Sequence, residues 1–145
     1  MAKFDLHNRI HTVPAIPPAI GVTNANTAYV SSIIDTRGYG SCEFVILSGT
    51  ETDANATFAV TMDEGDAANL SDASAVAAAD LLGSYALANF QFDDDNETRK
   101  IGYVGNKRYV RLTVTPSGND AGVAYVAAVA ILGNANLGPT ANPPQ

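Results

Sequence analysis

The sequence is poor in the side chains that carry most enzyme and metal chemistry. Its 145 residues include a single cysteine, Cys42, two histidines and no tryptophan. A lone cysteine cannot close an intrachain disulfide or build a cysteine-based zinc site, so folding must rest on packing. With no histidine after His11, a serine triad would have to recruit the first residues of the chain. We therefore expect a protein that is not an enzyme, with no catalytic residues, no metal site and no cofactor.

Positive charge and long apolar runs are also scarce. Eight Lys and Arg against fifteen Asp and Glu give a formal net charge of −7, which has the wrong sign for binding bare DNA or anionic lipid. The chain starts without the apolar run of a secretory signal, and its longest apolar stretch, 121–132, is about half of a membrane span. We expect neither nucleic acid nor a membrane as partner, and synthesis in the cytoplasm.

What the sequence does contain is a period of two. With 46% hydrophobic and 16% charged residues, it has the composition of one globular domain. Strands are predicted at 28–36, 41–47, 55–62, 85–92, 99–104, 107–115 and 123–132, the last apolar on both faces and therefore central. One helix is predicted at 72–82, where alanine is frequent. Glycine, asparagine and proline turns between the strands predict an all-β fold, an antiparallel β-sandwich or jelly roll.

The two ends of the chain lack this period. Residues 1–27 contain Pro14, Pro17 and Pro18 with scattered apolar residues, which predicts an extended N-terminal arm. Residues 134–145 are rich in proline and small polar residues, which predicts a flexible C-terminal tail. The sandwich domain is then expected at 28–133, and a chain without residues 1–20 should still fold.

Charge is unevenly distributed along the sequence. Thirteen of the fifteen acidic residues lie between Asp35 and Glu97. Five of the eight basic residues follow at once, namely Arg99, Lys100, Lys107, Arg108 and Arg111. This order predicts a molecule with one acidic and one basic side. A basic stripe with interleaved tyrosines could stack single-stranded nucleic acid, but docking onto acids of an adjacent subunit is the favoured reading.

Two short acidic runs, 63–66 and 93–97, gather hard oxygen ligands of the kind calcium prefers. Neither run has EF-hand spacing. We interpret both as solvated turns that discourage edge pairing between sheets, with calcium as the alternative.

Several strand and turn patterns together resemble small virion structural proteins of tailed bacteriophages. The segments that carry the resemblance are 33–50, 58–60, 70–83 and 106–115, within about 29–133. The nearest group is the capsid decoration, or cement, proteins. The resemblance implies a dimeric or trimeric β-sandwich on the exterior of a capsid, in a virion assembled in the host cytoplasm, where it bridges subunits of the major capsid protein.

The resemblance carries over no catalytic residue and leaves two alternatives, a head–tail connector or tail-tube protein and a glycan-binding virion module. Candidate contact residues for the capsid or for a second copy are taken from the arm, from one glycine-containing loop and from the basic stripe. They are Phe4, Leu6, Arg9, Ile10, Arg37, Tyr39, Arg99, Lys100, Lys107, Arg108 and Arg111.

Overall fold

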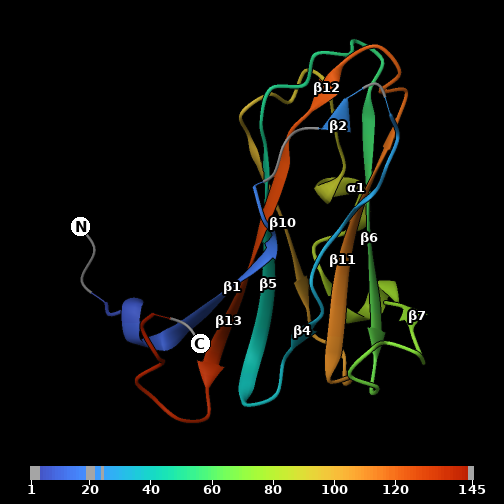
Figure 1. The fold of residues 1–145 in the computed structure, drawn as a ribbon. Helices are drawn as coiled ribbons and strands as arrows, with labels where there is room; N and C mark the ends of the chain where they lie inside the picture. Colours follow the sequence, from blue (N-terminus) through green and yellow to red (C-terminus); the bar gives the residue numbers. More distant parts are fainter. Residues whose placement is uncertain (1–3, 19–21, 24, 144–145) are drawn as a thin grey trace.

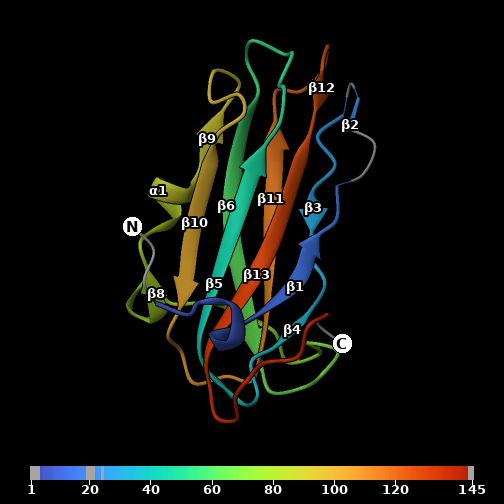
Figure 2. The same cartoon turned by 90° about the vertical axis from the view of Figure 1, so that its left-hand side faces the viewer.

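The protein is a sandwich of two antiparallel sheets, as predicted (Figures 1 and 2). The computed structural model describes residues 4–18, 22–23 and 25–143. The first sheet has the order β1 (Ile10–Ile16), β13 (Val126–Ala135), β5 (Tyr39–Ser48), β10 (Thr98–Tyr103), β8 (Leu81–Leu82). The second has the order β3 (Tyr29–Val30), β11 (Tyr109–Ser117), β6 (Thr57–Gly65), β7 (Ser74–Ala75), with β4 (Ile34–Asp35) on β11 and β9 (Phe90–Gln91) on β6. A small third sheet pairs β12 (Val123–Ala124) with β2 (Val22–Thr23).

The core lies between the inner faces of the two large sheets and follows the alternation of the sequence. From Cys42 to Ile46 in β5 every second residue is buried, with Phe44 and Ile46 fully inaccessible. On the opposing sheet β6 and β11 run antiparallel over nine paired residues, and Leu112 lies opposite Met62. Because side chains alternate between the faces of a strand, this pattern fixes which face of each sheet is inside.

The strand β13 is central in the first sheet, as expected, with β1 on one side and β5 on the other. Its inward residues Ala128 and Ala130 are buried, whereas its outward residues Ala127, Val129 and Ile131 remain half-buried. The second apolar face of this strand therefore lies on the surface of the sandwich.

The prediction of a helix at 72–82 is wrong. This stretch forms β7, a short 3₁₀ turn η2 (Ala78–Asp80) and β8. Tertiary pairing outweighs the helix propensity of alanine here, because the backbone N–H of Val76 donates to the Met62 carbonyl and Leu81 pairs with Tyr103. The predicted strand at 85–92 instead begins with a helical turn, α1 (Tyr85–Ala88), and only its end forms β9.

The N-terminal segment also differs from the prediction, because it contains a strand of the sandwich, β1. β1 pairs with β13 from Ile10 to Ile16, and Ala15 and Ile16 are buried in the core. Only residues 4–9, with the 3₁₀ turn η1 (His7–Arg9), stand off the sheet before β1 (Figure 1). A deletion of residues 1–20 would remove β1, an edge strand of the first sheet that contributes apolar side chains to the core. The shortened chain would therefore lose part of the core as well as the arm. Residues 1–3, 19–21 and 24 of the expected arm lie outside the described residues.

The C-terminal segment is likewise attached to the body. The Thr140 backbone N–H donates to the Asn8 carbonyl, and its hydroxyl donates to the Ile10 carbonyl at 2.6 Å. The described part of the expected tail thus packs along η1 and the start of β1, and residues 144–145 lie outside the described part.

Candidate functional site

The predicted basic stripe does not form a free surface, because four of its five cations are neutralised within the chain. Arg108 binds Asp35 through two hydrogen bonds of 2.9 and 2.7 Å. The other pairs are Arg111 with Asp63 at 2.9 Å, Lys107 with Asp66 at 2.6 Å, and Arg99 with Asp94 at 2.8 Å and with Glu97. Three of these four cations bind acids from the first half of the sequence, whereas Arg99 binds the nearby Asp94 and Glu97.

This pairing corrects the expectation of one acidic and one basic side. Strands β6 and β11 are neighbours, so the acids at the end of β6 lie opposite the bases at the start of β11. The pKa of Asp35 is lowered by its hydrogen bonds with Arg108, and the pKa of Lys107 is raised by its pairing with Asp66. Lys100 has no ion pair with any described residue; it is exposed on β10. A continuous cationic docking stripe is absent from the described surface.

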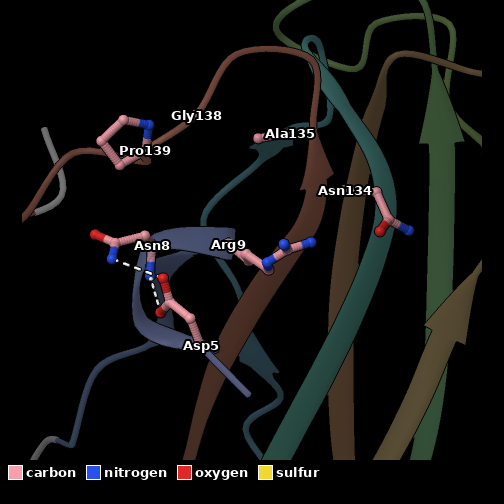
Figure 3. A pocket seen from close by; sticks show the side chains of 7 residues that line it. All are labelled: Asp5, Asn8, Arg9, Asn134, Ala135, Gly138 and Pro139. Carbon is pink, nitrogen blue, oxygen red and sulfur yellow. Dashed lines mark hydrogen bonds between the residues drawn. The ribbon is translucent and has the colours of Figure 1, made fainter.

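The arm and the C-terminal segment together form one surface, which we call the terminal face and define as residues 4–9 and 134–143. A groove of about 420 Å³ lies in it. The groove is lined by Asp5, Asn8, Arg9, Asn134, Ala135, Gly138 and Pro139 (Figure 3). The Arg9 side chain extends into this groove toward Asn134 (Figure 3). The groove joins two segments more than one hundred residues apart in sequence.

Local hydrogen bonds set the shape of the terminal face. The Asp5 carboxylate accepts from the Asn8 backbone N–H at 3.1 Å and from its side-chain amide at 2.8 Å, which closes the turn η1. These bonds lower the pKa of Asp5, so it stays ionised near Arg9. On the other side of the groove Asn134 adopts a left-handed backbone conformation, φ 53°, which turns the chain as β13 ends.

Three large apolar side chains on the terminal face are left in solvent. Phe4 is 94% exposed, Leu6 65% and Leu137 87%. Isolated exposed apolar residues are common on protein surfaces, whereas several on one projecting segment indicate an interaction surface. Of the arm residues predicted to make contacts, Phe4 and Leu6 are exposed, whereas Ile10 is half-buried in β1.

The other predicted contact residues lie at the beginning of β5. Tyr39 pairs in register with Ala135, and its ring stacks on His11 with centroids 5.5 Å apart. Arg37 is exposed in the turn before β5, and its backbone N–H donates to Asp35. The structure brings Arg9 and Tyr39 to the same end of the molecule through β13. Arg108 also lies near this end, because it binds Asp35 and its carbonyl accepts from Thr36, whereas Lys100 lies on β10.

Sequence reasoning missed a second surface feature, an apolar groove on the outer face of the first sheet. It measures about 600 Å³. Its walls include Pro14, Pro17 and Pro18, together with Leu47 of β5 and Ala127 and Val129 of β13. None of the described residues that line it is charged. The sequence carries a signal for this groove, because 123–132 is apolar on both faces, but a central core strand would show the same pattern.

At the end of the sandwich away from the terminal face, the loop after β5 holds two buried carboxyl groups, Glu51 and Asp53. Glu51 is 5% exposed, and burial raises its pKa to about 7. Asp53 is 6% exposed, but backbone N–H groups of Ala121 and Asn55 donate to it and lower its pKa.

Among the described residues, no three His, Cys, Asp or Glu side chains are placed to hold a metal ion. No described helix has the length and apolar character needed to cross a membrane.

Comparisons with other proteins give a fold rather than a family. No protein-family model matches the chain, and neither does any curated protein sequence. Among solved structures, the PBSX exported protein XepA is similar over 87% of this chain and 38% of its own, with 15% identity and a TM-score of 0.52. An infectious bursal disease virus structure (9% identity, TM-score 0.48) and the xylan-binding module CBM15 (10% identity, TM-score 0.42) are also similar.

The matches differ in how much of each protein they cover. They cover 87% of this chain and 32% of the bursal disease virus chain, and 92% of this chain and 96% of CBM15. The chain thus spans less than two thirds of XepA and of the viral chain. At 15% identity, the likeness to XepA shows a shared β-sandwich fold alone.

Proposed function

We propose that this chain is a non-enzymatic structural protein that decorates and stabilises the capsid shell of a tailed bacteriophage. It binds the capsid exterior and bridges subunits of the major capsid protein. The strand and turn patterns within 29–133 resemble those of decoration proteins, and the fold shared with XepA is compatible with this class.

The observation that carries the proposal is the terminal face. It combines a polar groove holding Arg9 with the exposed apolar side chains Phe4, Leu6 and Leu137. Such a mixture of apolar anchors and polar rim is typical of protein interfaces. Because the Thr140 hydrogen bonds hold the two segments together, the face is largely formed before binding, which lowers the entropic cost of association.

Because the capsid repeats the same subunit surface, a small contact surface on each copy is sufficient for stable binding. A capsid presents the same subunit surface many times, so a decoration protein that contacts two neighbouring subunits gains effective concentration at the second contact. The sandwich supplies a rigid body between these contacts. The ion pairs inside the chain leave the apolar and polar groups of the terminal face, rather than a charged stripe, as the proposed contact with the major capsid protein.

The test is binding of the purified chain to shells assembled from the major capsid protein of the same phage. The wild type should co-sediment with the shells and raise their thermal stability. The double variant Arg9→Glu, Leu137→Ser should lose binding at least tenfold, because it reverses a charge and removes an anchor on the terminal face. Leu87→Ser is the matched control, since Leu87 is 73% exposed on α1, away from this face. Equal binding by the double variant would refute the assigned surface.

The alternatives predict different results. A connector or tail-tube protein would form rings or tubes on its own in electron micrographs, without shells. A glycan-binding module would bind a glycan array, and the charge reversal at Arg9 would change that binding. Absence of shell binding by the wild type would overturn the proposed function itself.

A further inference from the structure

The apolar groove on the outer face of the first sheet lacks a partner within the described chain. Its walls come from Pro14, Pro17 and Pro18 on one side and from Leu47, Ala127 and Val129 on the other. Leu47 is 43% exposed at the edge of the groove. A concave surface of about 600 Å³ whose described lining carries no charge suits apolar side chains.

The chemistry of the groove indicates how an occupant would bind. Proline has no backbone N–H, so the segment from Pro14 to Pro18 offers few donors for an added β-strand. Pairing by strand addition is therefore unfavourable along this edge. The occupant must insert side chains instead of extending the sheet.

The same chain carries side chains of the required kind. Phe4 and Leu6 are exposed on residues 4–9, which stand off the outer face of the first sheet (Figures 1 and 2). Neither side chain lines the groove of its own chain. The arm joins β1 at Ile10, opposite Gly133, whereas the groove runs from Thr12 to Pro18 on the β1 side and reaches Ala127 on β13. Ala127 is six residues from Gly133 along β13, so at about 3.3 Å per residue the far end of the groove lies roughly 20 Å from the start of the arm.

We propose that two copies of the chain associate by exchanging arms, with Phe4 and Leu6 of each copy inserted into the apolar groove of the other. The inference deepens the proposed function and rests on it, because it supplies the homo-oligomer that spans neighbouring capsid subunits. In this dimer Phe4 and Leu6 are buried between the two copies, which leaves Arg9, Leu137 and the polar groove of the terminal face for the contact with the capsid. A two-fold axis makes the exchange reciprocal, so each copy gives one arm and receives one.

The buried area and the net charge of the protein both bear on this arrangement. A phenylalanine side chain buries about 150–250 Å², so two Phe–Leu arms and the groove walls they cover bury on the order of 1,000 Å². This value is near the minimum of about 1,000 Å² expected of a biological interface and below the range of most specific, stable ones. Each copy carries a formal charge of −7, which opposes association. A contact through uncharged side chains keeps the repelling carboxylates out of the interface.

The first test is the oligomeric state of the full chain, measured by analytical ultracentrifugation without shells. The wild type should be a dimer at micromolar concentration. The arm variant Phe4→Ser, Leu6→Ser and the groove variant Leu47→Glu should each weaken dimerisation at least tenfold, while Leu87→Ser should not. Circular dichroism and thermal unfolding show whether each variant remains folded, since all four positions are exposed.

Mixing the variants distinguishes arm exchange from other dimers. The arm variant keeps an intact groove and the groove variant keeps an intact arm, so their mixture should recover one of the two contacts and form a weak heterodimer. A dimer made through a symmetric patch would recover nothing. Loss of association in both variants without any recovery on mixing would overturn the exchange.

A cross-link gives an independent readout. A chain with Leu6→Cys mixed with a chain of different mass carrying Leu47→Cys should form a mixed disulfide on oxidation, whereas Leu87→Cys should not replace Leu47→Cys. Cys42 is 4% exposed and takes no part. A wild type that stays monomeric and still binds shells overturns the arm exchange and leaves the proposed function standing. A wild type that dimerises by arm exchange but does not bind shells overturns only the proposed function.

Discussion

Glu51 is expected to make the protein less stable as the pH rises toward neutrality. Its Oε1 accepts from the Tyr125 backbone N–H at 3.2 Å, whereas its Oε2 is buried without a hydrogen-bond donor among the described residues. The Asp95 carboxylate, which accepts from the Glu51 backbone N–H at 2.7 Å, adds a nearby negative charge. Burial and then Asp95 raise the pKa of Glu51 from 4.5 to about 7, although the Tyr125 hydrogen bond lowers it.

The sign follows from proton linkage. Between pH 4.5 and 7 the unfolded chain releases the Glu51 proton while the folded chain retains it, so the folded state binds more protons and loses stability as the pH rises. Each pKa unit corresponds to about 1.4 kcal/mol. The rise in the pKa of Glu51 to about 7 therefore costs the folded state up to roughly 3 kcal/mol at pH 8, and nothing below pH 4.

The assay is urea unfolding of the wild type and Glu51→Gln between pH 4.5 and 8.5. The amide keeps an oxygen acceptor for Tyr125 and cannot ionise. We expect Glu51→Gln to be more stable than the wild type by about 1–3 kcal/mol at pH 8, with the difference shrinking toward pH 5. A difference that does not change with pH would refute the reasoning.

Asp53→Asn is the matched control with the opposite sign. Its pKa is lowered by the Ala121 and Asn55 N–H groups, so its carboxylate stabilises the folded state above the unfolded pKa and loses this effect as the pH falls. The variant should be less stable than the wild type at neutral pH and should approach it in acid.

Two further predictions concern the core. Burial raises the pKa of the Cys42 thiol to about 12, so Cys42 should react with a thiol reagent at pH 8 only after unfolding in urea, and rapid reaction of the native protein would contradict its placement in β5. Leu112→Ala should lower the free energy of unfolding by about 3 kcal/mol because Leu112 is fully buried, whereas Thr115→Ala on the exposed side of β11 should change it by less than about 0.5 kcal/mol in the same urea titration.

The strands that bury one face could be predicted from the sequence because their signal is local. In β6 and β11 the apolar residues alternate with polar ones, and the structure places these strands side by side with Leu112 opposite Met62. The segment 72–82 could not be assigned in this way. Its alanines favour a helix locally, but the chain gains more by pairing Leu81 with Tyr103 and burying it.

The candidate site likewise combines features that could be predicted from the sequence with features that could not. The sequence indicated Phe4 and Leu6 as contact candidates in an extended arm, and the structure leaves both exposed. The pairing of Arg108 with Asp35 did not, because the residues are 73 positions apart and meet only once β4 and β11 are neighbours. A sequence read along its length separates the acids from the bases, whereas the antiparallel topology brings them together.

The hydrogen bonds from Thr140 to Asn8 and Ile10 have a topological consequence. They hold the segments near the two described ends of the chain side by side, which is the arrangement that circular permutation requires. A short linker could join these ends, and the ring could be opened at the loop after β5, at the far end of the sandwich (Figure 1). Such a circular permutant would carry new ends, and any peptide fused to them, on the side of the molecule away from the terminal face.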